Sequence, residues 1–210
     1  MAKIVLVRHG HVEGIHPERF RGRMDVPLTA EGTRQALAVA ECVAARWRPA
    51  LVYTSPLQRC VATGRPIAAA AAVESVVLSG LDDLDYGEWQ WRTYDEVRDD
   101  WPVLFDLWLS APHLVRFPRG ESLQDLIVRM ADVLRMVLER HATGTVVLVG
   151  HDSGIRALLL QLLDQPVSAY RRLAPQPASI SEVEILGHQV RVLSINETQH
   201  LQRPQGGRRP

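Results

Sequence analysis

The sequence has little cysteine, a single lysine and no long hydrophobic run. Its two cysteines, Cys42 and Cys60, fit no metal-binding spacing and indicate no disulfide framework, which is typical of a reducing compartment. The apolar run near the N-terminus is too short for a signal peptide, and no stretch approaches the length of a transmembrane helix. We therefore expect a cytoplasmic protein with no membrane partner.

The chain also has no excess of charge of either sign. Its 24 basic and 24 acidic residues give a formal net charge of zero, and Lys3 is the one basic residue that is not arginine. This balance argues against nucleic acid or an anionic membrane surface as the main partner. A length of 210 residues is sufficient for one substantial core, so we expect one domain.

Short β-branched runs alternate with longer helical patterns. The predicted strands are residues 3–7, 50–55, 73–78 and 143–150, the predicted helices are residues 28–47, 56–71, 93–109, 121–140 and 154–163, and residues 179–195 form a predicted hairpin. This alternation predicts a three-layer α/β/α sandwich with a mostly parallel sheet. We expect the domain to span residues 1–200 and the tail, residues 201–210, to be disordered because it has no apolar pattern.

Five residues mark helix boundaries. Thr29 is a predicted N-cap, and Thr93 with Glu96 three residues later matches a capping box. Pro102 should kink or split the helix that contains it. Pro56 suits the first turn of the helix after the second strand.

Polar residues follow two of the predicted strands. Arg8 and His9 end the first strand, with Gly10 behind them, and His151 ends the strand at residues 143–150. Ligands of such sheets bind outside the carboxyl ends of the strands, so we expect both histidines in one crevice. Arg59 lies about one turn inside the helix after the second strand, so we expect it beside the same crevice. A pocket of arginines and histidines in a neutral protein favours phosphate or another dense oxyanion.

Other residues near this edge of the sheet could have purely structural roles. Asp82, Asp83 and Asp85 follow the third strand and could be ordinary turn residues. The tryptophans fit core packing, or the wall of a site for a substrate with an apolar or planar surface; they are Trp89, Trp91, Trp101 and Trp108.

At these residues the chain resembles the phosphoglycerate mutase-like branch of the histidine phosphatase superfamily. The resemblance runs from about residue 3 to residue 201, with its motifs in order: LVRHG, GRMDVPLTAEGTRQA, YTSPLQRC, LDDLDYGEW, PRGESLQDL, LVGHDSGIRALL and NETQHL. It implies the phosphoglycerate mutase-like fold and a phosphatase that needs no metal or cofactor.

The resemblance also assigns roles to five residues. It makes His9 the nucleophile that accepts the phosphoryl group, and Arg8, Arg59 and His151 the phosphate-binding residues. The family's proton donor is usually a glutamate four residues before the Gly of a Tyr/Phe-Gly-x-Trp motif, and that position is Asp83 here. We therefore expect hydrolysis of a small phosphomonoester, with Asp83 as general acid.

The chain departs from the family pattern around the substrate mouth. Ile15 stands where many relatives have Asn, and WQW stands where they often have Trp-Glu-Gly. Residues that could reshape the mouth are His11, Glu13, Trp91, Arg19, Arg21 and Arg23, and Asp152 has no assigned role. The physiological substrate therefore stays open, as does the oligomeric state, a homodimer included.

Four rival functions remain in view. A phosphoglycerate mutase would share the core chemistry, but mutases of this family are longer between the acid loop and the Gly-Glu-Ser helix. A binding module would keep the pocket without turnover. A metal-dependent hydrolase could use His9, His11, Asp83 and His151 as ligands, although Arg8 and Arg59 oppose a divalent cation. The VGHDSG segment resembles a nucleophile elbow, but Ser153 is out of register with the Gly-x-Ser-x-Gly pattern.

Overall fold

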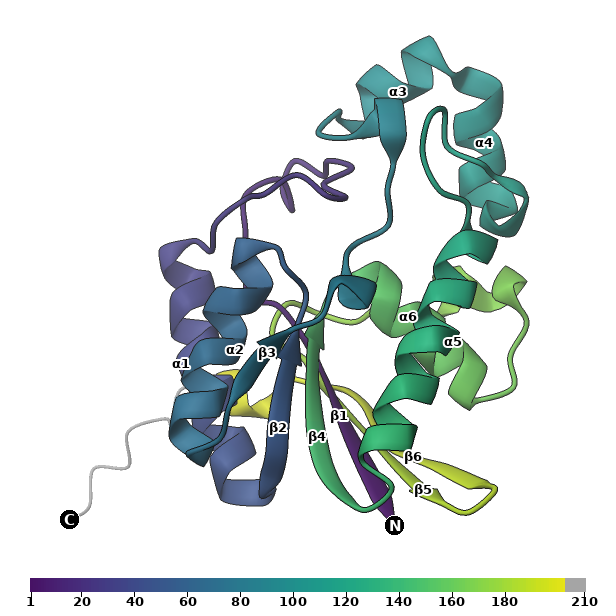
Figure 1. Cartoon of the computed structure of the whole chain (residues 1–210). Helices are drawn as coiled ribbons and strands as arrows, with labels where there is room; N and C mark the ends of the chain where they lie inside the picture. Colours follow the sequence, from purple (N-terminus) through teal and green to yellow (C-terminus); the bar gives the residue numbers. More distant parts are fainter. Residues whose placement is uncertain (203–210) are drawn as a thin grey trace, which may run out of the picture.

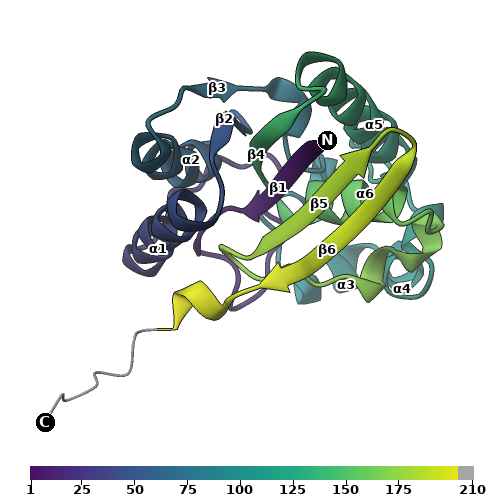
Figure 2. The same ribbon diagram turned by 90° about the horizontal axis from the view of Figure 1, so that it is seen from below.

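A six-stranded sheet lies at the centre of the computed structural model, which describes residues 1–202 (Figure 1). The strands are β1 (Ala2–Arg8), β2 (Pro49–Thr54), β3 (Ser75–Val77), β4 (Gly144–Gly150), β5 (Ile180–Leu186) and β6 (Gln189–Glu197). Their order is β3-β2-β4-β1-β5-β6, which is visible from below in Figure 2. The pairs β3–β2, β2–β4 and β4–β1 are parallel, and β5 is antiparallel to β1 and β6. The predicted mostly parallel sheet and the predicted hairpin are confirmed.

Helices cover both faces of the sheet and complete the predicted three layers. α1 (Ala30–Arg46) and α2 (Gln58–Ala71) lie on one face, and α5 (Leu123–Arg140) and α6 (Asp152–Leu162) lie on the other (Figures 1 and 2). α3 (Tyr94–Asp100) and α4 (Pro102–Ser110) form a lobe beyond the carboxyl ends of the parallel strands. Short 3₁₀ helices complete the chain: η1 (Ser79–Leu81), η2 (Gly87–Trp89), η3 (Pro112–Leu114), η4 (Val167–Arg172) and η5 (Gln199–Leu201).

Two apolar clusters hold these layers together. Leu6 of β1 faces α5, where it joins Leu126 and Met130, whereas Val5 and Val7 face the α1–α2 layer. A strand buried on both faces needs a continuous apolar run, which explains why β1 shows no alternation of polar and apolar residues. This packing fixes β1 firmly and so determines where the residues after it lie.

Most of the predicted helix boundaries are confirmed. Thr29 caps α1 by accepting the N–H of Gly32, and Thr93 with Glu96 forms a reciprocal capping box at α3. Pro102 splits the predicted helix in two, because it starts α4 at its first position and cannot continue α3.

The prediction for Pro56 was wrong. α2 begins at Gln58, two residues later than a helix with Pro56 in its first turn. The Asp25 carboxylate, from a distant loop, accepts the backbone N–H of Gln58 at 2.8 Å. This tertiary contact satisfies a free N–H at the helix start, and no local sequence signal reveals it.

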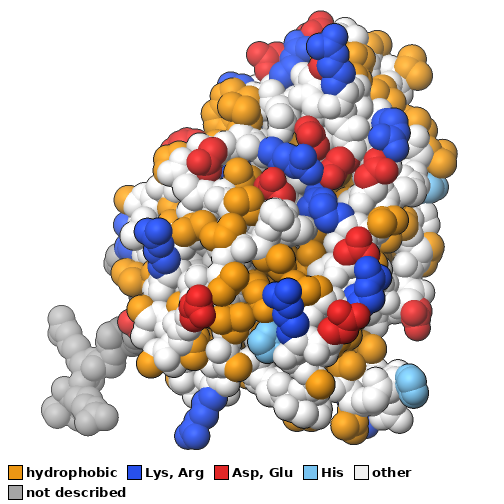
Figure 3. Space-filling view, in the orientation of Figure 1, with side chains coloured by type: hydrophobic (Ala, Val, Ile, Leu, Met, Phe, Trp, Pro, Cys, Tyr) orange, Lys and Arg blue, Asp and Glu red, His pale blue; other side chains and the backbone are white. Residues whose placement is uncertain are grey.

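Three further expectations concern the surface charge, a membrane-spanning helix and the C-terminal tail. Figure 3 shows acidic and basic side chains interspersed on the visible face. Within residues 1–202, no helix combines the length and the apolar character needed to cross a bilayer. Leu201 ends η5 and packs on the α1–α2 side of the core, while residues 203–210 of the predicted tail lie outside the described residues.

Candidate active site

The two predicted histidines lie side by side at the carboxyl edge of the sheet. β1 and β4 are parallel neighbours in which Arg8 pairs with Gly150, so the next residue of each strand leaves the sheet at the same level. The rings of His9 and His151 have centroids 5.3 Å apart and are inclined at 62°. Both side chains are buried, at 2% and 1% exposure. The structure thus brings together residues that are far apart in the sequence.

His9 has one nitrogen free for chemistry. Its Nδ1 lies 2.7 Å from the carbonyl oxygen of Gly10, and because a carbonyl only accepts, Nδ1 carries the proton. The lone pair is then on Nε2. Burial, and after it the positive charges of Arg59 and Arg8 and the neighbouring His151, lowers the pKa of His9 well below 6.5. The imidazole is therefore neutral and nucleophilic near neutral pH.

Gly10 lets the chain after His9 pass close to helix α1. A Cβ at Gly10 would lie 2.5 Å from the carbonyl oxygen of Gly32, so a larger residue requires the backbone to move. The N–H of Gly10 also donates to Oγ1 of Thr63, on α2. These contacts fix the peptide that orients the His9 ring.

Arg59 lies in the first turn of α2 and is fully buried, and its guanidinium contacts several parts of the site. Its Nη1 and Nη2 donate to the carbonyl oxygens of Met24 and Gly22 at 2.6 and 2.7 Å. Nη2 also donates to Oδ2 of Asp83 at 3.1 Å, and Nε donates to Nδ1 of His151 at 3.2 Å. One guanidinium therefore ties the loop before α1 to both the predicted acid and the second histidine.

These contacts define the protonation of His151. Because its Nδ1 accepts from Arg59, a neutral ring carries its proton on Nε2, which donates to Oγ of Ser55 at 2.8 Å. Burial, followed by the charges of Arg59 and Arg8, lowers the pKa of His151 well below 6.5. Sequence reasoning missed Ser55, although it directly follows β2 at the same edge.

Arg8 has an unsatisfied donor in this pocket. It is 8% exposed, and its Nη1 donates to the carbonyl oxygen of Pro175 at 2.6 Å. Its Nε is buried and has no hydrogen-bond partner within residues 1–202. A buried N–H without a partner is costly, and an oxyanion bound beside it would satisfy it.

Asp83 is the one predicted aspartate whose carboxylate enters the site. Asp83 is 8% exposed, and its Oδ2 contacts Arg59 and lies 3.4 Å from Nδ1 of His151. Its Oδ1 accepts the N–H of Leu84 at 2.9 Å and the hydroxyl of Ser153, at the start of α6. Sequence reasoning considered Ser153 only as a rejected nucleophile, whereas its hydroxyl holds the Asp83 carboxylate.

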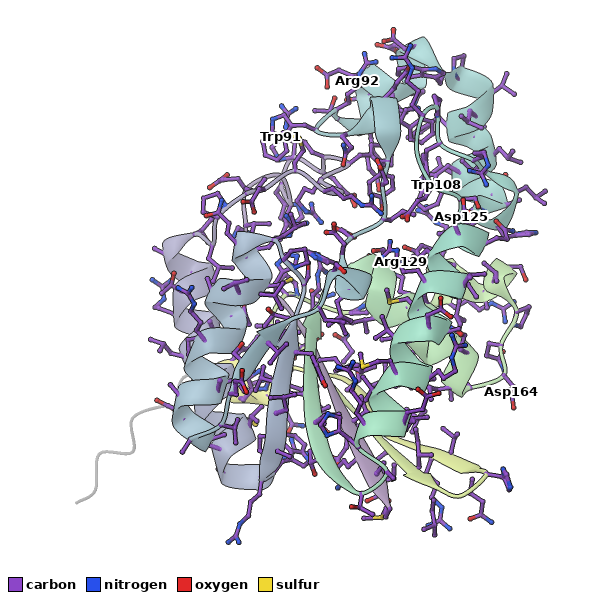
Figure 4. All side chains as sticks on the ribbon, viewed as in Figure 1. Trp91, Arg92, Trp108, Asp125, Arg129 and Asp164 are labelled. Atoms are coloured by element: carbon purple, nitrogen blue, oxygen red, sulfur yellow. The ribbon has the colours of Figure 1, made fainter. Side chains whose placement is uncertain are left out.

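The backbone that carries Asp83 is held by Arg129, which extends from α5 toward the middle of the molecule (Figure 4). Arg129 donates to the carbonyl oxygens of Gly80, Asp82 and Asp83 at 3.0, 2.7 and 3.1 Å, and its Nη2 pairs with Glu121 at 2.9 Å. Sequence reasoning missed this residue, because an arginine off the apolar face of a helix reads as solvated.

The tryptophans are mainly core residues. Trp89 and Trp108 are 0% and 4% exposed and pack around Phe117, and in Figure 4 Trp108 projects inward from α4. Trp91 lies over the guanidinium of Arg19. Trp108 is the one tryptophan that touches the cavity beside Asp83, whose lining is mostly polar. That the substrate has an apolar or planar surface stays a prediction.

His11 does not join the other polar residues. Its Nδ1 lies 3.0 Å from Oγ1 of Thr29, at the start of α1. Within residues 1–202, no group of three or more His, Cys, Asp or Glu side chains is placed to share a metal ion. The donor geometry offers no support for the ligand set His9, His11, Asp83 and His151.

The fold, the paired histidines and the arginines define a histidine phosphatase. The chain belongs to the histidine phosphatase superfamily, branch 1, whose model matches residues 4–198. It is 32% identical over 201 residues to phosphoserine phosphatase 1 of Hydrogenobacter thermophilus, covering 96% of this chain and 95% of the relative.

Two further proteins show the range of this similarity. The chain is 34% identical over 184 residues to a probable phosphoglycerate mutase, GpmB, of Klebsiella pneumoniae, covering 88% of this chain and 85% of the relative. The solved structure of a phosphoserine phosphatase mutant from Entamoeba histolytica in complex with phosphoserine superposes with a TM-score of 0.85 at 26% identity, covering 96% of this chain and all of that one.

Proposed function

We propose that this protein is a phosphomonoesterase that hydrolyses a small phosphorylated metabolite through a phosphohistidine on His9. The observation that carries the proposal is the free Nε2 lone pair of a buried, neutral His9 beside the charges of Arg8 and Arg59. Membership of the histidine phosphatase superfamily and the phosphatase names of relatives support it.

In the first step, Nε2 of His9 attacks phosphorus while the bond to the leaving oxygen breaks. Asp83 gives its proton to that oxygen, so the leaving group departs as an alcohol. In the second step, Asp83 takes a proton from water, the water oxygen bonds to phosphorus, and the phosphorus–nitrogen bond breaks. Asp83 thus enters the first step protonated and regains its proton from water in the second.

Three neighbouring side chains lower the barrier without forming covalent bonds. Arg8, Arg59 and His151 stabilise the negative charge that spreads over the transferred oxygens, and positioning and electrostatics supply most of the catalysis. The Nε of Arg8 can donate a hydrogen bond to a phosphoryl oxygen without breaking a contact within the protein. None of these steps uses a metal or cofactor, so EDTA should not reduce turnover.

Labelling of His9 tests the proposal directly. Wild-type protein quenched during turnover of p-nitrophenyl phosphate should carry a phosphate that is stable in alkali and labile in acid. His9→Ala should lose both the label and essentially all turnover. His188→Ala, at the exposed hairpin turn, is the matched control and should keep both. Wild-type rates in His9→Ala would refute the proposal, and binding of phosphate without any turnover would favour a binding module.

A phosphoglycerate mutase is the second candidate, and the similarity to a probable mutase favours it. A mutase must protect its phosphohistidine from water until the intermediate is rephosphorylated. The segment between Gly87 and Gly120 is short, and we infer that it shields a phosphohistidine less completely than a longer segment would. We expect 3-phosphoglycerate with catalytic 2,3-bisphosphoglycerate to isomerise slowly or not at all, while other monoesters release phosphate. Rapid formation of 2-phosphoglycerate with little free phosphate would reverse this choice.

The proposal includes a cytoplasmic location and a small-molecule partner. Cys42 and Cys60 are both free thiols, which suits a reducing compartment. A homodimer is compatible with this proposal, and sedimentation of the purified protein tests it.

A further inference from the structure

Asp152 places a negative charge next to the proposed phosphate-binding residues. It is the first residue of α6, directly after His151, and it lines the cavity beside Asp83. Its Oδ1 lies 3.9 Å from Nη1 of Arg8. None of the steps of the proposed mechanism uses this carboxylate, and its charge repels an anion that binds nearby.

The contact between Asp152 and Arg8 is too long to hold the arginine in place. At 3.9 Å it exceeds hydrogen-bond distance, whereas Nη1 of Arg8 donates to the carbonyl oxygen of Pro175 at 2.6 Å. Arg8 is also the last residue of β1, which is fixed by its pairing with β4. Arg8 therefore keeps its position without Asp152, and what Asp152 supplies to it is charge.

This charge acts on the guanidinium that would bind phosphate. Burial lowers the pKa of Arg8, and the carboxylate of Asp152 is the strongest of the charges that oppose this effect. The Nε of Arg8 has no hydrogen-bond partner in the described part of the chain, so it is open to a phosphate oxygen. A phosphate bound there and the Asp152 carboxylate would interact with the same guanidinium and repel each other.

Arg156 holds the Asp152 carboxylate at this place. Its Nε donates to Oδ1 of Asp152 at 3.1 Å, and its Nη2 lies 2.9 Å from Oδ2, which makes a two-point contact. Arg156 also lines the cavity beside Asp83. Removal of the Asp152 charge would leave Arg156 with an uncompensated positive charge there. The changes at Arg8 and at Arg156 would both favour an anion.

We propose that Asp152 is a counter-charge that weakens the binding of phosphate at the active site and so promotes its release after hydrolysis. The inference rests on the proposed phosphomonoesterase function, in which phosphate is a product of every turnover. Arg8 and Arg59 are both buried beside His9, and their charges alone would hold a phosphate dianion tightly. Slow release of a product limits turnover, so a lower affinity for phosphate favours a faster enzyme.

Calorimetry with inorganic phosphate tests the sign of this effect. Asp152→Asn keeps the shape of the side chain and removes its charge, so the Kd for phosphate should fall about 10-fold. Asp152→Ser is also neutral and should lower the Kd as well. Asp132→Asn is the matched control, because it removes the same charge from an exposed position on α5 and should keep the wild-type Kd. An unchanged or higher Kd in the neutral Asp152 variants would overturn the inference.

A double variant separates charge from local structure. Asp152→Asn combined with Arg156→Gln removes one charge of each sign from the same ion pair. The Kd for phosphate should then return to within about 3-fold of the wild-type value. A Kd that stays as low as in Asp152→Asn alone would mean that the shape of the site, and not its charge, sets the affinity, and would overturn the inference.

Steady-state kinetics separates this inference from the proposed function. Phosphate should inhibit the hydrolysis of p-nitrophenyl phosphate by Asp152→Asn with a Ki about 10-fold lower than in wild type. If the protein hydrolysed no monoester, the phosphomonoesterase would be refuted, and the calorimetric Kd would still decide whether Asp152 opposes phosphate binding. Unchanged values of Ki and Kd beside normal turnover would overturn only the inference about Asp152.

Discussion

At the scale of single residues, a comparison of two leaving groups tests the proposed role of Asp83 as general acid. In the proposed mechanism Asp83 matters when the leaving oxygen is a strong base, because an alkoxide departs only with a proton. Asp83→Asn should therefore lower kcat by roughly 10²- to 10⁴-fold for an alkyl phosphate. The same change should cost p-nitrophenyl phosphate far less, because its phenolate leaves unaided. Steady-state kinetics on both substrates measures the difference.

Asp82→Asn is the control for that experiment. Asp82 is the sequence neighbour, but its carboxylate lies near Arg23 and outside the contacts of Arg59, so the two substrates should respond alike. Equal losses on both substrates in Asp83→Asn would remove Asp83 from the role of acid and direct attention to Asp82 and Asp85.

The sequence could predict some site residues and not others, for a physical reason. His9, His151 and Arg59 follow strands, and the edge where parallel strands end is a place that chain order reveals. Ser153 and Arg129 act through contacts with the loop that carries Asp83. Such contacts depend on how α5 and α6 pack over the sheet. Residue type and spacing along the chain do not reveal this packing.

At the scale of elements, helix α5 holds the acid loop in place through one side chain. Arg129→Met removes three hydrogen bonds to loop carbonyl oxygens while keeping the stem of the side chain. The loop should then place Asp83 less accurately, and we expect kcat on an alkyl phosphate to fall about 10- to 100-fold. The loss on p-nitrophenyl phosphate should be smaller, because that substrate does not depend on the proton.

Arg135→Met is the matched control on the same helix. Arg135 is exposed and pairs only with Asp132 three residues earlier, so its loss should leave both rates unchanged. If Arg129→Met lowered both rates equally, Arg129 would stabilise the fold rather than position the acid.

Helix boundaries show the same division between local and distant causes. The capping box at Thr93 and Glu96 and the break at Pro102 depend on neighbouring residues, and the sequence predicted both. The start of α2 depends on Asp25, which approaches from another part of the chain, and there the prediction failed.

At the scale of the whole molecule, the two buried histidines link stability to pH. The pKa of each is lowered well below 6.5 in the folded state, chiefly by burial, so the unfolded chain binds more protons at mildly acidic pH. Their contribution is present above pH 6.5 and is lost as pH falls below it, by about 1.4 kcal/mol per pH unit for each proton. Urea unfolding between pH 7.5 and 5 measures this slope.

His9→Gln should flatten that slope, because it removes one of the two titrating groups. His188→Gln, in the exposed turn, should keep the wild-type slope. Identical slopes in wild type and His9→Gln would show that His9 is not forced to stay neutral by the fold.

The position of β4 has a consequence for biosynthesis. β4 comes late in the chain, at residues 144–150, yet it lies between β2 and β1, which are both made early and do not touch each other. A growing polypeptide that has not reached residue 150 cannot join β1 and β2 into the native sheet. The facing edges of these two apolar strands therefore stay unpaired until β4 is made. We infer that His9 and His151 come together only after most of the polypeptide has left the ribosome, and that the unpaired strand edges make the incomplete chain prone to aggregation.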